Sequence, residues 1–103
     1  MVSTEADVLI LGDFIGFDWD EGNRGKNWRL HGVSDAECEQ LFFNQPLFTL
    51  PDEAHADGEA RHLALGRTDR GRRLAVIFTS RQNRLRVISA REMTKRERTL
   101  YPR

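Results

Sequence analysis

The sequence predicts an α+β domain in which two N-terminal helices precede an antiparallel meander sheet of three or four strands, and one helix follows it. Two capping-box patterns, Ser34 with Glu37 and Thr94 with Glu97, indicate helix starts on either side of the sheet. Between them lie three segments with the alternation or the β-rich apolar content of strands, namely residues 61–67, 74–80 and 85–91. Because only short turns separate these segments, we expect consecutive strands to pair antiparallel.

Each of the two N-terminal helices has start and stop signals. Asp20 can cap the first helix, which would end at Gly32. The second helix would begin after Ser34, cover about residues 35–43 and stop before Pro46. Both helices are therefore expected to be short.

The remaining elements follow from alternation and turn residues. Residues 47–50 alternate and predict a short strand that ends at Pro51, at one edge of the sheet. Residues 52–58 are polar and predict a loop, and the sequences TDRGRR and RQNR predict the two turns of the meander. The last helix is expected over about residues 95–101.

Length and composition predict one cytoplasmic domain. A chain of 103 residues is about one domain long. We expect residues 17–103 to form this domain and residues 1–16, which show no clear period, to be an N-terminal extension. The single cysteine, Cys38, cannot form an internal disulfide and fits a reducing compartment. No apolar run approaches the roughly 20 residues of a membrane span, so no membrane partner is expected.

The formal net charge of zero conceals an uneven distribution of charge along the chain. Residues 1–60 contain 13 acidic and three basic side chains, whereas residues 61–103 contain three acidic and 13 basic ones. Twelve of those 13 basic residues are arginine, whose planar fork suits phosphate. The two halves could simply neutralise each other in the fold. Alternatively, the second half forms a basic face for nucleic acid or another acidic partner.

Arginines at the ends of the predicted strands are candidate phosphate ligands. Arg61 begins one strand and Arg81 ends the next, and in an antiparallel pair these two ends lie together. Alternation places Arg91 on a face with Ser89, Val87 and Leu85, and the register decides whether Arg81 shares that face. The opposing interpretation is that these arginines are solvated and paired with the acidic half.

Two side chains near Arg61 could transfer protons. Glu59, two positions earlier, would lie on the same side of an extended segment. A carboxylate, an imidazole and a guanidinium would suffice for RNA cleavage without metal, and His55 is a possible proton carrier. No histidine pair has the spacing of a zinc site and Cys38 stands alone, so we expect neither a metal ion nor a cofactor.

A series of short segments resembles the BrnT toxin family of bacterial type II toxin–antitoxin systems. In order they are Trp19 and Asp20; Asn27, His31, Gly32 and Val33; Asp52, His55, Glu59 and Arg61; Gly66; Thr79 and Arg81; Ile88, Ser89, Ala90 and Arg91; and Glu97 and Tyr101. Each segment alone is weakly specific, whereas their order and spacing together are specific. The resemblance runs from Phe17 to about Tyr101.

The resemblance implies a fold, an activity and a partner. Members of the family resemble RelE and ParE toxins in fold and act as ribonucleases that arrest translation. A BrnA antitoxin, whose own domain binds operator DNA, neutralises them. The resemblance therefore implies RNA as substrate and a BrnA-like antitoxin as partner, with a possible toxin dimer inside an operator-binding complex.

By position, the resemblance makes Glu59, Arg61 and Arg81 the catalytic candidates. Lys26 and Arg91 become candidates for binding RNA phosphate, and Arg86, an arginine of the third predicted strand of the meander, is a further candidate from the sequence itself. In one place the sequence departs from the family, since Leu30 stands where a lysine is usual before His-Gly. Two other functions stay open: a ParE-like inhibitor that binds a protein target without cutting, and a catalytically degenerate module that only binds an antitoxin.

Overall fold

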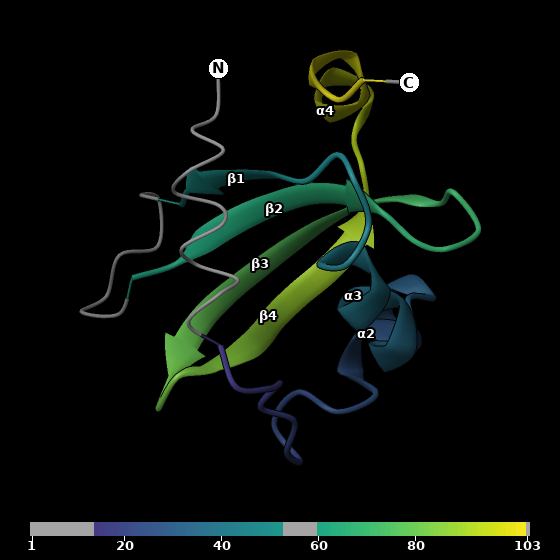
Figure 1. The fold of residues 1–103 in the computed structure, drawn as a ribbon. Helices are drawn as coiled ribbons and strands as arrows, with labels where there is room; N and C mark the ends of the chain where they lie inside the picture. The colour runs from purple at the N-terminus through teal and green to yellow at the C-terminus, as the bar shows by residue number, and fades with distance from the viewer. Residues whose placement is uncertain (1–13, 53–59, 103) are drawn as a thin grey trace.

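The computed structural model describes residues 14–52 and 60–102. In chain order these residues contain α2 (Lys26–His31), α3 (Asp35–Leu41), β1 (Phe48–Pro51), β2 (His62–Arg67), β3 (Arg73–Arg81), β4 (Arg84–Glu92) and α4 (Lys95–Leu100). The strands form one sheet in the order β1-β2-β3-β4, and each neighbouring pair is antiparallel. The predicted α+β meander, with two helices before the sheet and one after it, is confirmed (Figure 1).

Local capping explains where the helices begin. Both capping boxes form, and in α3 the Ser34 hydroxyl accepts from the Glu37 N–H at 3.1 Å while the Glu37 carboxylate accepts from the Ser34 N–H at 3.0 Å. The first helix is shorter than predicted from Asp20, because residues 21–25 form turns and Gly25 adopts a left-handed φ of 69°. Helix α2 therefore starts only at Lys26.

The sheet has apolar side chains on both faces. On one face, strand residues such as Leu74, Val76 and Phe78 pack against Leu41 and other buried residues of the α3 region. On the other face, a smaller cluster consists of Leu65, Ala75, Met93 and Tyr101, with Phe48 and Leu63 beside it. Tyr101 follows α4 directly, so this helix is anchored at the end of the sheet, apart from α2 and α3 (Figure 1).

The outer edge of β4 is covered by residues 15–27. The Ile15 N–H donates to the Asn83 carbonyl, and the Asp18 N–H donates to the Leu85 carbonyl, both at 2.9 Å. Farther along the strand, the buried Asn27 side chain accepts from the Ala90 N–H at 3.0 Å. An uncovered edge strand offers its backbone to other chains, and this cover removes that hazard.

A β-bulge in β4 corrects the predicted alternation of that strand. Phe78 pairs with Val87 but Ile77 pairs with Ser89, so Ile88 is the extra residue. Leu85 and Val87 are therefore in the core cluster on the α3 side. The prediction that Arg91 shares a face with Val87 and Leu85 was wrong, because the extra residue reverses the alternation between them.

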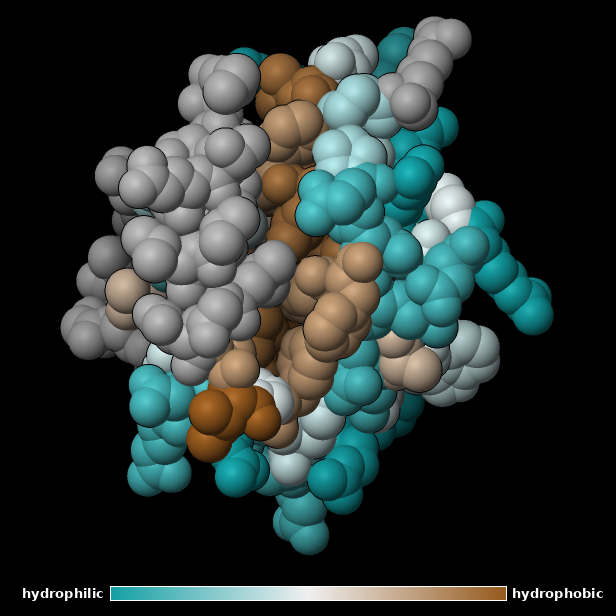
Figure 2. Space-filling view, viewed as in Figure 1, coloured by the Kyte–Doolittle hydropathy of each residue, from teal (hydrophilic) through white to brown (hydrophobic). Residues whose placement is uncertain are grey.

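The surface on the side viewed in Figure 1 includes an apolar strip beside hydrophilic side chains (Figure 2). A groove of about 150 Å³ is lined by Phe14, Gly16, Phe17, Phe42, Phe43 and Leu85. Phe43 is 78% exposed and Ile15 is 71% exposed.

None of the helices in the described parts of the chain is long and apolar enough to cross a membrane.

Candidate functional site

A row of polar side chains crosses three strands at the end of the sheet where β2 begins and β3 ends. The register pairs Thr79 with Arg86, and the β2–β3 register continued by one residue places Arg61 opposite Thr79. The Thr79 hydroxyl donates to the Ala60 carbonyl at 2.6 Å and so fixes the start of β2 against β3. Because Phe78 is in the α3-side core, alternation puts this row on the opposite face of the sheet.

Arg61 has an unusual environment for an arginine. Its side chain is half-buried, and its Nε is buried without an acceptor among residues 14–52 and 60–102. Its backbone is fixed, since the Arg61 carbonyl accepts from the Asp52 N–H at 2.9 Å. A buried donor without a partner costs about 1–3 kcal/mol, so such a group is rare in a site with only a structural role.

Arg81 lies at the same end and on the same face of the sheet. It is the exposed last residue of β3, two positions beyond Thr79. The pKa of Asp20 is lowered by the hydrogen bond from Arg86, by the Gly22 N–H and also by the charge of Arg81. Because Arg61 and Arg86 flank Thr79 on the two neighbouring strands, the register makes Arg81 a diagonal neighbour of both of them.

Arg86 is held by carboxylates of the N-terminal segment. Its guanidinium contacts Asp20 at 3.0 Å and Asp18 at 3.4 Å, and its side chain is only 12% exposed. These contacts raise the pKa of Arg86, first through the hydrogen bond to Asp20. In this arrangement Arg86 attaches residues 18–20 to β4.

Lys26 also has a partner inside the fold. Its Nζ donates to the carbonyl of Ile88, the extra residue of the bulge. A bulge leaves backbone groups outside the regular ladder, and a lysine ammonium satisfies one of them here. Lys26 thus joins the start of α2 to β4.

Arg91 attaches α4 to the sheet. Its two terminal nitrogens contact the two carboxylate oxygens of Glu97 at 2.7 and 3.0 Å, a bidentate pair. Glu97 is also the N3 residue of the α4 capping box. The hydrogen bond from Arg91 lowers the pKa of Glu97 although burial opposes it.

The Arg91–Glu97 pair predicts that acid destabilises the docking of α4. A carboxyl whose folded pKa is lowered stabilises the fold fully above its unfolded value, near 4.5, and this stabilisation is lost as the pH falls through the folded pKa. Thermal melts between pH 7 and pH 3 should show a smaller acid-dependent loss for Glu97→Gln than for the wild type. Equal losses in both proteins would show that the pair does not contribute to the acid dependence.

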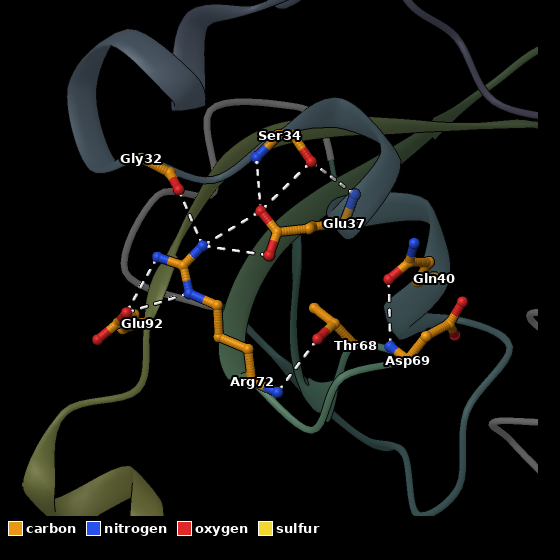
Figure 3. Close-up of polar contacts among 8 residues, drawn as sticks. All are labelled: Gly32, Ser34, Glu37, Gln40, Thr68, Asp69, Arg72 and Glu92. Atoms are coloured by element: carbon orange, nitrogen blue, oxygen red, sulfur yellow. Dashed lines mark hydrogen bonds and ion pairs between the residues drawn. The ribbon is translucent and has the colours of Figure 1, made fainter.

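Arg72, which the sequence analysis did not single out, connects several elements of the fold (Figure 3). Its Nη1 donates to the Gly32 carbonyl at 2.8 Å and contacts Glu37 at 3.1 Å, while Nη2 contacts Glu92 at 3.0 Å. Burial would raise the pKa of Glu37, but the hydrogen bonds from Ser34 and Arg72 outweigh it and lower the pKa. This arginine joins the end of α2, the start of α3 and the end of β4.

A second concentration of positive charge lies at the opposite end of the sheet, and the sequence analysis missed it. A hollow of about 960 Å³ is lined by Arg67, Gly71, Arg73, Lys95, Arg98, Thr99, Tyr101 and Pro102. Arg67 and Arg73 are opposite each other in the β2–β3 register. The sequence feature that could have predicted this pair is the tight turn between β2 and β3, because it places the arginines at the two strand ends side by side.

The remaining residues considered in the sequence analysis are either outside the described part of the chain or buried in the core. Glu59 and His55 lie outside the described residues, as does most of the predicted loop at 52–58. Cys38 is fully buried, and burial together with the charges of Asp35, Glu37 and Glu39 raises its pKa to about 12. Its thiolate form is therefore scarce near neutral pH. Residues 14–52 and 60–102 contain no group of three or more His, Cys, Asp or Glu side chains placed to hold a metal ion.

Comparison with known proteins identifies the family. The comparison with curated proteins found no match to the chain. The family model of the ribonuclease toxin BrnT of type II toxin–antitoxin systems matches residues 19–97, most of the chain. Membership of this family implies RNA as the substrate and an antitoxin as the partner, whereas the likeness to RelE and ParE toxins and the domain boundary at residue 17 stay predictions. The chain belongs to the BrnT family of ribonuclease toxins of type II toxin–antitoxin systems.

Proposed function

We propose that the chain is a metal-independent endoribonuclease that acts in the cytoplasm, cuts RNA at the Arg61 end of the sheet and thereby arrests translation. The main support is the Arg61 side chain, whose buried Nε lacks an acceptor in the described parts of the chain. A phosphate oxygen would accept a hydrogen bond from this Nε and would at the same time compensate the positive charge of the guanidinium. The nearby Arg81 supplies a second guanidinium on the same face.

The proposed chemistry uses the 2′-hydroxyl of the RNA as nucleophile. A base removes the 2′-hydroxyl proton, and the 2′-oxygen forms a bond to phosphorus while the bond from phosphorus to the 5′-oxygen breaks. An acid protonates the leaving 5′-oxygen, so the products end in a 2′,3′-cyclic phosphate and a 5′-hydroxyl. Arg61 and Arg81 would stabilise the additional negative charge on phosphorus oxygens in the transition state.

Glu59 and His55 are the proposed proton-transfer residues. Glu59 precedes Arg61 by two residues in the sequence, and we assign it the role of general base or of a carboxylate that orients an arginine. His55 is assigned as a proton carrier. Of the three residues proposed to bind phosphate, Lys26, Arg86 and Arg91, each would have to exchange an intramolecular partner for RNA.

We further propose a BrnA-like protein as the antitoxin. An acidic segment of such a partner would cover the arginines at the Arg61 end of the sheet, and complementary potentials would speed association. Covering Arg61 and Arg81 with carboxylates would also block the phosphate site. A toxin dimer within a complex that binds operator DNA through the antitoxin completes this proposal.

The experiment is cleavage of a 5′-labelled RNA by the purified chain, freed of antitoxin, in the presence of EDTA. We expect cleavage with a 2′,3′-cyclic phosphate at the new 3′ end. The same oligonucleotide with a single 2′-deoxy sugar at the cut position should remain whole. Intact RNA both alone and on ribosomes would refute the proposal, as would cleavage that EDTA abolishes and Mg²⁺ restores.

A further inference from the structure

The hollow at the other end of the sheet has the composition of an anion site. Four of its lining side chains are the cations of Arg67, Arg73, Lys95 and Arg98, and no carboxylate is among the lining residues that the structure describes. Its volume of about 960 Å³ is at the upper end of the range for ligand pockets and exceeds what a single phosphate would fill.

No carboxylate of residues 14–52 or 60–102 pairs with the cations of the hollow. Among the residues placed by the structure, Arg67, Arg73 and Lys95 form no hydrogen bond or ion pair with their side chains, and Arg98 donates only to the Met93 carbonyl at 3.0 Å. This differs sharply from Arg72, Arg86 and Arg91, which all contact carboxylates. The fold therefore keeps one set of basic side chains available at this end.

Arg67 and Arg73 oppose each other at a cost to stability. They face each other directly in the antiparallel register, where like charges repel at short range. Tyr101 lies beside them and is fixed by its hydroxyl, which donates to the Pro46 carbonyl. Both arginines act on this tyrosine, since their charges lower its pKa while burial, the larger effect, raises it. An anion between the two guanidinium groups would remove the repulsion.

The hollow and the Arg61 end lie on one face of the sheet. Arg61 and Arg67 are separated by six positions of an extended chain and therefore point to the same side. At about 3.3 Å per residue, roughly 20 Å separates them, a distance that a single RNA strand of several nucleotides can cover. Between them Leu63 and Ile77, paired across β2 and β3, are half-buried and leave apolar surface beside the path.

We infer that the hollow lined by Arg67, Arg73, Lys95 and Arg98 binds phosphates of the same RNA strand that is cut at the Arg61 end. This inference rests on the proposed ribonuclease function and adds a second contact region to it. Arginine forks bind phosphate in bidentate fashion, which favours RNA over a carboxylate-bearing segment of a partner protein. Short RNAs that reach only the Arg61 end would lose this contact, so affinity should rise with RNA length.

The test measures binding separately from cleavage. A fully 2′-O-methylated RNA cannot form the 2′-oxygen nucleophile and reports affinity alone. Its dissociation constant is measured at several salt concentrations for three proteins. These are the wild type, the hollow variant Arg67→Ala/Arg73→Ala and the control variant Arg24→Ala/Arg70→Ala. The control removes two exposed arginines that do not line the hollow.

We expect the hollow variant to bind a 15-nucleotide probe at least about tenfold more weakly than the wild type. The slope of the logarithm of the binding constant against the logarithm of the salt concentration should become shallower by about 1.4, the value for two lost single-strand phosphate contacts. The control should change the slope by less than half of that, and a four-nucleotide probe should not distinguish the three proteins. Removal of the like-charge pair should raise the melting temperature slightly, which separates lost binding from lost folding.

Three outcomes would overturn the inference. The hollow variant could bind the long probe like the wild type, the control could weaken binding equally, or the hollow variant could lose only its affinity for the antitoxin. Failure of the proposed function is distinguishable, because in that case unmodified RNA would stay whole while the methylated probe still showed the length-dependent difference.

Discussion

Replacement of Arg61 with alanine is expected to lower the rate of RNA cleavage by about 10²- to 10³-fold, the usual effect of removing one preorganised donor to a transition-state anion. The buried Nε of this side chain has no acceptor in the described fold, so its removal breaks no hydrogen bond of that atom. The melting temperature should therefore change little. Cleavage rates of a labelled RNA under single-turnover conditions measure the effect on chemistry.

Two further variants test whether the effect depends on the guanidinium of Arg61 and on its position in the fold. Arg61→Lys keeps the charge but not the planar fork, and should restore only part of the rate. Arg70→Ala removes an exposed arginine from the β2–β3 turn and should cleave RNA at the wild-type rate. If Arg61→Ala arrested growth and cut RNA as fast as the wild type, the proposed site would be at the wrong end of the sheet.

The parts of the fold that could be predicted from sequence depend on local signals. The capping boxes at Ser34 and Thr94 set the starts of α3 and α4 because the hydrogen bonds involved lie within four residues. Strand pairing followed from the short turns in the same way. The bulge at Ile88 could not be predicted, since it depends on how β4 meets β3 and on the ammonium of Lys26, 62 positions earlier in the sequence.

Which arginines contact carboxylates and which do not could likewise not be predicted from the sequence. Arg72 and Arg73 are neighbours of the same type, yet Arg72 contacts Glu37 and Glu92 whereas Arg73 faces the hollow. The difference comes from direction: Arg72 precedes the strand and reaches the α3 side, and Arg73 lies within it and points to the other face. Charge counts predicted a basic half of the chain, but the carboxylate partners of its arginines range from six positions away, for Arg91 and Glu97, to 66 positions away, for Arg86 and Asp20.

A second large effect is expected for Gly66, where a single methyl group should destabilise the fold. A Cβ at this position would lie 2.8 Å from Cγ and 3.1 Å from Cδ1 of Leu41, and 3.3 Å from Cδ1 of Leu47. Leu41 is completely buried, so its side chain has little space to retreat. Overpacking of this kind costs about 1–3 kcal/mol, which lowers the melting temperature of a domain this size by roughly 5–20 °C for Gly66→Ala.

A double-mutant cycle separates steric crowding from any backbone effect of losing the glycine. Leu41→Ala alone should cost about 2–5 kcal/mol because it leaves a cavity beside α3. In that background the Cβ of Gly66→Ala occupies space that Leu41 has vacated, so its added cost should fall well below its cost in the wild type. An unchanged cost would place the origin in the backbone of β2, although the contact between α3 and β2 at Leu41 argues for crowding.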